Sequence, residues 1–377
     1  MNNLDNFIVG VSKQIVYLKN NQIMNGDINE SKKIFDELFQ KLLKRKKFAL
    51  DQYIWKELYT LSLYFYNNTK YIGDIPIVMV TKHNDIVPWY MQQFSKKQST
   101  DTILHFDTHA DMNPIKNSIL LPGNKNIQEI QNIVWDIGAA ISGTIFTTGQ
   151  RDYVWCMPSW LPDKNIIIDY FLKPYRKIIK FYTNTSFNDN TIDINFTNKI
   201  NGDKYNKNIY SKIRTGRLTD KQYRNMVDLI KKNGNTYILD IDLDYFVCNG
   251  SKIVDFDDYF EDPFDVQSFY RTEKIYFNQD IPRETTDIKS AAFKKYNNNL
   301  NKEIQNINKR IKDFLHLIKS LKKDGLTPSL ISICDSTNIM FQDCQTCNSI
   351  SNGYVPDNLA LLVHYKIFEG LQKLFNN

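Results

Sequence analysis

Short apolar runs alternate with segments of helical periodicity along most of the chain. The apolar runs, which have the length of buried strands, lie at 75–80, 102–107, 153–158, 165–168, 236–246 and 330–334. Apolar residues recur at helical spacing at 28–66, 127–141, 219–232, 287–323 and 356–375. This alternation of strands and helices predicts an α/β fold. Because the strands are continuously apolar, we expect a mainly parallel central sheet with helices on both faces.

The same pattern predicts one large domain with two further segments, one before it and one within it. Residues 1–71 are expected to form an N-terminal helical extension, and 72–377 the main domain. Residues 183–217 are rich in Asn, Thr, Lys and Asp and hold no sustained period. They are interpreted as an insertion, a lid or an irregular hairpin.

The most informative segment follows the second apolar run. Asp107, His109 and Asp111 occupy alternate positions there. Alternate side chains share one face of a strand, so the three groups would project the same way from the strand end and the loop that leaves it. Two carboxylates and an imidazole at close range are unfavourable unless a cation neutralises them. The segment therefore predicts a metal site.

A second acidic motif occupies the apolar run at 236–246. Asp240, Asp242 and Asp244 are expected on one face of that strand, where like charges repel. Acidic residues that end a strand or cap a helix could explain either motif alone. Together, five aspartates and one histidine favour a metal centre, and an oxygen-rich ligand set favours Mn²⁺ or a similar divalent ion. Structural zinc would require more thiolate and histidine.

Composition restricts the class of protein and its partners. Hydrophobic residues make up 42% of the chain and charged residues 24%, as in ordinary globular proteins. The net charge of +6 comes from scattered lysines, and the one basic cluster, 44–47, is interpreted as a solvated helix end, so no specific nucleic-acid partner is expected. The sequence shows no signal peptide and no apolar run that could span a membrane. Its odd number of cysteines, five, suits a reducing compartment. These features predict a cytoplasmic protein.

The two acidic motifs resemble those of the arginase/deacetylase superfamily of binuclear manganese hydrolases, and most closely those of its peptide arginase branch. The strings His-Phe-Asp-Thr-His-Ala-Asp at 105–111 and Leu-Asp-Ile-Asp-Leu-Asp-Tyr-Phe at 239–246 carry this resemblance, which covers roughly 72–370. It implies an arginase-like, three-layer α/β/α fold and two divalent metal ions, Mn²⁺ by preference. The implied reaction is hydrolysis of an arginine guanidinium in a peptide or protein to ornithine and urea.

Carried over by position, the resemblance also implies a set of metal ligands. Asp107 would bridge the two ions, His83 and Asp111 would complete one of them, and His109 would serve the other.

The second motif supplies the remaining ligands in one of two registers. Asp240 with Asp242 is the preferred pair and Asp242 with Asp244 the alternative, because the chain continues with Tyr-Phe where the superfamily has Gly-Leu-Asp-Pro or similar. The third carboxylate would then orient a ligand or the attacking water. In the catalytic step, Asp242 or Asp244 would steer or relay the proton.

Three further residues are candidates for catalysis or substrate binding. His105 lies in phase with Asp107 and could support a ligand, or be a buried core histidine. Asp335 ends the strand at 330–334 and could bind a guanidinium, or cap a turn. Tyr354 could line the mouth of the site, although its Gly-Tyr-Val-Pro segment also suits a helix start.

Two other functions compete with arginine hydrolysis. One is a deacetylase or other amidohydrolase of the same fold. The other is a metal-binding structural protein without turnover, because the chain offers no obvious counterpart of the proton-shuttle histidine of free-arginine arginases. The sequence leaves homo-oligomerisation open.

Overall fold

The computed structural model places its described residues in two compact units. These residues are 13–15, 28–44, 58, 61–62, 69–80, 82–90, 101–108, 111, 140–141, 144, 152–158, 182–184, 191–195, 209–216, 218–247, 286–337, 355 and 357–376. The first unit comprises 1–70, 247–309 and 337–369, and the second 71–246, 310–336 and 370–377. Every described residue of the candidate site belongs to the second unit. The predicted division at residue 71/72 stays a prediction.

The second unit is built on a mixed sheet whose order is β1-β2-β9-β8-β3-β4-β7-β6-β5. The strands are β1 (Tyr71–Ile72), β2 (Ile75–Val80), β3 (Thr102–Phe106), β4 (Asp152–Met157), β5 (Tyr182–Asn184), β6 (Thr191–Asn195), β7 (Ile209–Arg214), β8 (Thr236–Asp242) and β9 (Thr327–Cys334). The six strands from β2 to β7 in this order pair in parallel, while β1, β6 and β5 pair antiparallel at the two sides. The predicted α/β class with a mainly parallel sheet is confirmed.

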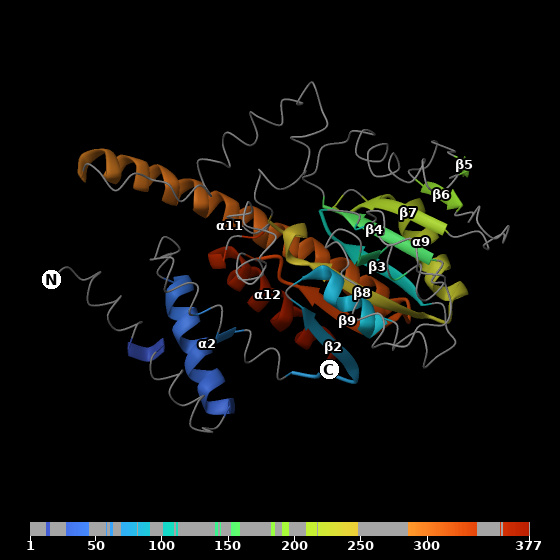
Figure 1. Cartoon of the computed structure of the whole chain (residues 1–377), viewed down its shortest axis with the longest axis horizontal. Helices are drawn as coiled ribbons and strands as arrows, with labels where there is room; N and C mark the ends of the chain where they lie inside the picture. Colours follow the sequence, from blue (N-terminus) through green and yellow to red (C-terminus); the bar gives the residue numbers. More distant parts are fainter. Residues whose placement is uncertain are drawn as a thin grey trace, which may run out of the picture. The chain divides into compact units, whose positions relative to one another are not determined.

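Strands β3 and β8 lie side by side within the sheet (Figure 1). Every residue of β3 is buried, and so is every residue of β8 after its first, as expected of strands covered on both faces. From β3 the chain continues to its neighbour β4, and from β8 to its neighbour β9 on the opposite side. The two strands thus flank a topological switch point, beside which open α/β sheets bind their ligands at the carboxyl ends of the strands.

Helices form where the sequence has helical spacing. They are α2 (Ile28–Lys44), α9 (Asp220–Lys232), α11 (Thr286–Lys323) and α12 (Asp357–Phe375). A capping box of Thr219 and Gln222 opens α9. Gly325, at φ +76°, follows α11, and the Leu326 amide donates to the Leu321 carbonyl oxygen. This is the left-handed glycine stop that the sequence indicates. Among the described residues, no helix is long and apolar enough to cross a membrane.

An aromatic cluster packs α11 against the segment that follows β8. Phe314 is fully buried and lies edge-on to Phe106, with ring centroids 4.9 Å apart, and edge-on to Phe246 at 5.4 Å. Tyr245 packs against the rings of both Phe106 and Phe246. These contacts anchor the carboxyl end of β8, where the second acidic motif lies.

The structure describes three strands in or next to the polar stretch 183–217, for which the sequence predicts an insertion, a lid or an irregular hairpin. Residues 209–214 form β7, a strand of the parallel part of the sheet, and β5 and β6 pair as antiparallel neighbours. The Asn- and Lys-rich composition conceals β7, because the strand, Ile-Tyr-Ser-Lys-Ile-Arg, interrupts its apolar residues with Ser and Lys instead of forming an apolar run. The predicted strand at 165–168 and most of the predicted helix at 127–141 lie outside the described residues.

Candidate metal centre

The candidate metal centre is assembled at the carboxyl ends of four neighbouring parallel strands. His83 begins the short helix η1 (His83–Ile86) after β2, and Asp107 directly follows β3. Asp242 ends β8 and Asp335 directly follows β9. Because the carboxyl ends of parallel strands meet at one edge of a sheet, residues far apart in the sequence converge there.

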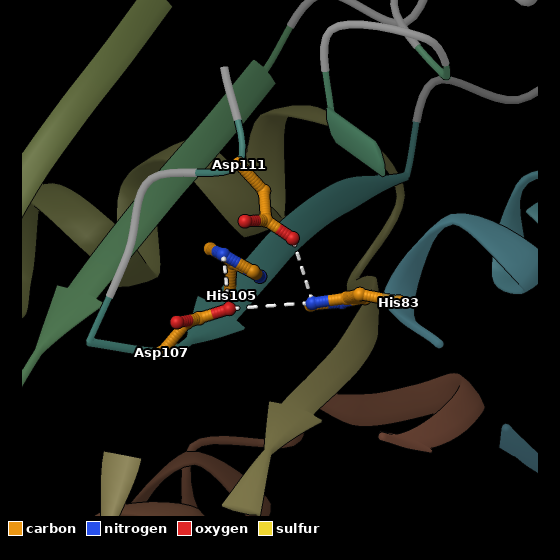
Figure 2. A group of neighbouring side chains, drawn as sticks. All are labelled: His83, His105, Asp107 and Asp111. Carbon is orange, nitrogen blue, oxygen red and sulfur yellow. Dashed lines mark ion pairs between the residues drawn. The ribbon is translucent and has the colours of Figure 1, made fainter. Parts of the chain in front are cut away.

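The imidazole of His83 lies at the middle of the carboxylates. Its Nδ1 atom lies 2.8 Å from an Asp111 oxygen, 3.3 Å from Asp107 and 3.4 Å from Asp242. On the opposite side of the ring, Nε2 lies 3.0 Å from Asp240 Oδ2. Figure 2 shows the Asp107 and Asp111 carboxylates turned toward His83, with His105 next to Asp107. Asp111 adopts φ +47°, a left-handed conformation that is uncommon outside glycine.

The end of β8 positions the second acidic motif. The strand stops at Asp242, and η4 (Leu243–Tyr245) begins there, with the Asp242 carboxylate accepting from the Asp244 amide at 2.9 Å. Asp244 therefore lies on a helical turn and not on the strand face, which corrects the expectation of one shared strand face. The Thr108 amide donates to Asp244 Oδ1 at 3.0 Å. This contact ties the two acidic segments together.

The centre concentrates negative charge in a buried place. Five aspartate side chains are at most 5% exposed, namely Asp107, Asp111, Asp240, Asp242 and Asp244. His83 and His105 are buried among them. Even with both rings protonated, carboxylates outnumber cations, and charge buried without a partner is costly. The excess negative charge has to be neutralised, either by protonation of a carboxylate or by bound cations.

The pKa values of the centre reflect this imbalance. Burial by itself would lower the pKa of His83, but attraction to Asp240 and Asp111 raises it well above the ordinary value. Burial opposes protonation of His105 too, yet Asp107 and Asp240 raise its pKa to about 10. Burial would raise the pKa of Asp240, but the two histidines lower it well below the usual range. The site therefore attracts positive charge, either protons or metal ions.

Among the residues that the structure describes, three sets of side chains could hold a metal ion, each with ligand atoms within 4.8 Å of one another. The first contains His83, His105, Asp107 and Asp111; the second Asp107, Asp242 and Asp244; the third His83, Asp242 and Cys334. The first two share Asp107, as expected if that carboxylate serves two ions. Asp240 belongs to none of the three.

The donor chemistry fits a divalent cation. Asp240 is ionised and can only accept, so the Nε2 atom of His83 carries the hydrogen between them. Without a second proton on the ring, the Nδ1 lone pair of His83 would face three carboxylate oxygens at 2.8 to 3.4 Å, an unfavourable arrangement. Such an arrangement needs a proton or a metal ion among these atoms. Carboxylates with imidazole are a ligand set for Mn²⁺ and related ions.

No family model matches the chain, and no curated protein matches it. The assignment of a function consequently depends on the geometry and chemistry of the site.

The structure brings together most of the residues proposed from the sequence. His83, His105 and the five aspartates converge. Asp335 is also buried, and its backbone amide donates to the Val80 carbonyl oxygen at 3.0 Å. Its carboxylate belongs to none of the three ligand sets. His109 and Tyr354 lie outside the described residues, so their roles remain predictions.

Other residues near the centre were not identified from the sequence. The Trp155 indole donates to the Asp107 carbonyl oxygen at 3.0 Å, and the Ser336 hydroxyl to the Asp242 carboxylate at 2.6 Å. Cys334 pairs with Asp242 across β8 and β9, and burial raises the pKa of its thiol. Their position depends on strand order and register, which no short motif encodes. The one sequence feature that could have identified Cys334 and Ser336 as neighbours of the site is their position at the end of a predicted strand.

The metal-free protein is expected to lose stability as the pH rises from about 6.5 to 8. The pKa values of His83 and His105 are raised on folding. Protonation therefore contributes stability that is complete below the unfolded histidine value of about 6.5 and is lost as the pH rises toward the folded value. The free energy of unfolding should fall by on the order of 2 kcal/mol, measured by urea denaturation with EDTA present.

His105→Gln should make this profile shallower, because it removes one of the two titrating rings. His316→Gln, on the exposed side of α11, is the matched control and should leave the slope unchanged. A flat or rising profile for the parent protein over this pH range would contradict the prediction.

Proposed function

We propose that this chain is a hydrolase that uses two divalent metal ions, Mn²⁺ by preference, to hydrolyse the guanidinium group of arginine in a peptide or protein. The observation that carries the proposal is the pair of buried ligand sets that share Asp107. An arginase-like fold, a three-layer arrangement of the helices around the sheet and a cytoplasmic location belong to the same proposal. The parallel sheet with both acidic motifs at its carboxyl edge supports it.

The first ion is assigned to the atoms around His83 Nδ1. Asp107, Asp111 and Asp242 each direct an oxygen to within 3.4 Å of this atom. One imidazole with three carboxylates is a plausible set for a hard or borderline divalent ion.

The second ion is assigned to Asp107, Asp242 and Asp244, with His109 added by the sequence motif. The geometry favours Asp242 with Asp244 over the pair preferred from the sequence, Asp240 with Asp242. Asp242 and Asp244 fall in one ligand set with Asp107, whereas Asp240 falls in none. Asp107 and Asp242 would then each contact both of the proposed ions.

Divalent ions held in this way would lower the pKa of a water molecule toward neutrality, which supplies the nucleophile that hydrolysis of a guanidinium needs. Asp244 is buried and held by the Thr108 amide. Because its carboxylate lies in one ligand set with Asp107 and Asp242, Asp244 is our candidate to accept the proton of the attacking water and transfer it to the leaving amine. Burial of the carboxylates excludes bulk solvent and strengthens their electrostatic interactions.

Asp335 is proposed to bind the substrate guanidinium. It lies at the same edge of the sheet as the ligands, one residue beyond Cys334, yet outside the three ligand sets. A carboxylate matches the planar, two-pronged donor array of a guanidinium. Asp335→Asn is expected to raise KM for an arginine peptide about tenfold or more, by loss of this charged contact.

The test of the proposed function is a product assay on the full chain loaded with Mn²⁺. Peptides with an internal arginine should release urea and leave ornithine, detected as a loss of 42 Da by mass spectrometry, a mass that follows from the reaction itself. The matched substrate control is the same peptide with lysine in place of arginine, which should be unchanged.

Two results would overturn the proposed function. Release of acetate from an acetyl-lysine peptide without urea from the arginine peptide would assign the site to deacetylation. Bound metal ions without turnover of either peptide would favour a structural role.

A further inference from the structure

We propose that Asp240 is a positioning residue that orients the metal ligand His83, and also His105, which contacts the metal ligand Asp107, and that Asp240 is not itself a metal ligand. This inference rests on the proposed function, because it concerns how the same metal centre is organised. It assigns a role to the most deeply buried carboxylate of the cluster, whose side chain is fully inaccessible to solvent.

The first step is the position of Asp240 in the sheet. It lies in β8, directly paired with His105 in the neighbouring parallel strand β3. It precedes the end of the strand by two residues, so it lies one layer deeper than Asp242. At this depth its carboxylate meets the two histidine rings.

The second step is the use of its Oδ2 atom. This oxygen lies 2.7 Å from His105 Nδ1 and 3.0 Å from His83 Nε2, so it accepts from both rings. Each ring then presents its other nitrogen to the ligand carboxylates. His83 Nδ1 faces Asp111 at 2.8 Å, and His105 Nε2 faces Asp107 at 3.2 Å.

The third step is the fixation of its Oδ1 atom. The Ser332 hydroxyl of β9 donates to this oxygen at 2.6 Å. Tyr90, fully buried, has its hydroxyl 2.8 Å from the Ser332 hydroxyl. Because Ser332 donates its only hydrogen to Asp240, Tyr90 is the donor in the second contact. Hydrogen bonds from two strands, β3 and β9, and from the helical segment η1 therefore hold both carboxylate oxygens, which leaves neither of them directed at the proposed ions.

The consequence is a defined tautomer and orientation for the ligand histidine. A carboxylate that accepts from one ring nitrogen fixes the hydrogen there, aims the other nitrogen at the metal and increases its basicity. Through His105, the same oxygen also fixes the Asp107 carboxylate, which is assigned to both ions. One buried residue thus organises a ligand of the first ion and the ligand shared by both.

The experiment compares Asp240→Asn with a control of matched burial. Asp240→Asn keeps the size of the side chain but replaces one oxygen by an amide, so both histidines can no longer share an ionised acceptor. The control, Asp101→Asn, removes a fully buried carboxylate that accepts from Thr236 and Ser329 at the amino end of the same sheet. Isothermal titration with Mn²⁺ on the full chain measures affinity and stoichiometry, and the visible spectrum of the Co²⁺-loaded protein reports ligand geometry.

We expect Asp240→Asn to bind the same number of Mn²⁺ ions as the parent protein with about 10- to 100-fold weaker affinity and an altered Co²⁺ spectrum. Asp101→Asn should keep the parent affinity and spectrum even if its folding stability falls. Tyr90→Phe, which deletes the donor to Ser332 and keeps Asp240 itself, should cause a smaller loss of affinity in the same direction, and provides a second variant if Asp240→Asn fails to fold.

Three outcomes would overturn the inference. Parent-like affinity and spectrum in Asp240→Asn would show that Asp240 positions nothing. Loss of one ion with unchanged affinity for the other would make it a direct ligand. Equal losses in Asp101→Asn would reduce the effect to general destabilisation. These results leave the proposed function standing, whereas a parent protein that binds neither Mn²⁺ nor Co²⁺ would remove the basis of both.

Discussion

Asp107→Ala is expected to abolish metal binding and hydrolytic activity together. Asp107 belongs to two of the three ligand sets, and its carboxylate is 1% exposed. Its removal takes an oxygen from both ions at once, so neither site keeps a full ligand set. We expect less than one tightly bound ion per chain by elemental analysis, and a loss of at least about a thousandfold in kcat/KM for urea release.

The control for this variant is Asp152→Asn. Asp152 is also a buried carboxylate of the sheet, but it begins β4 and accepts from Asn233, away from the carboxyl edge. It should keep both ions and most of the activity. If Asp107→Ala retained metal at the full stoichiometry of the parent protein, the ligand assignment would be wrong.

Phe314→Ala is expected to cause the largest loss of folding stability among the described side chains of the aromatic cluster. The ring is fully buried and lies edge-on to Phe106 and Phe246. Truncation removes these contacts and leaves a cavity that rigid neighbouring rings fill poorly. The expected cost is about 3–5 kcal/mol in the free energy of unfolding, measured by urea denaturation of the metal-free protein.

Lys312→Ala provides the comparison on the same helix. Lys312 is exposed, so its truncation should change the free energy of unfolding by less than about 0.5 kcal/mol. Because the cluster anchors the segment after β8, Phe314→Ala should also weaken Mn²⁺ binding when the affinity is measured under conditions in which the variant is still folded. A loss of stability below about 1 kcal/mol would show that the cluster contributes little.

The candidate centre illustrates a conflict between stability and function. Five buried aspartates at one edge of the sheet repel one another, and burial together with Asp107 raises the pKa of Asp111 although His83 opposes it. Such groups are unfavourable in a fold selected for stability alone. Their concentration beside a topological switch point is the reason to assign function to this edge.

Local sequence pattern was sufficient for the elements and for the first acidic motif. The apolar run at 75–80 coincides with β2, and the helical spacing at 287–323 differs from α11 by one residue. The buried face of a helix or strand requires apolar residues at the period of that element. A short stretch of consecutive residues is therefore enough to predict the element. Asp107 and Asp111 could be identified for a related reason, because carboxylates directly after an apolar strand are unfavourable without a cation.

The relation between the second acidic motif and the histidines could not be predicted in this way. Period-two spacing places Asp240 and Asp242 on one strand face but does not say which neighbouring side chain each will meet. The end of β8 at Asp242 moves Asp244 onto a helical turn. The parallel register sets Asp240 against His105.

The sequence by itself therefore determined that this chain forms an α/β sheet and carries two acidic motifs at strand ends, because both depend on residues adjacent in the chain. The tertiary structure alone decided which carboxylates face one another. It also decided that the Asp240 carboxylate accepts hydrogen bonds from two histidines and Ser332, and that Cys334 lies in a candidate ligand set. These outcomes depend on strand order and register, which bring together residues from 92 to 157 positions apart. Such contacts leave no periodicity in the sequence that records them.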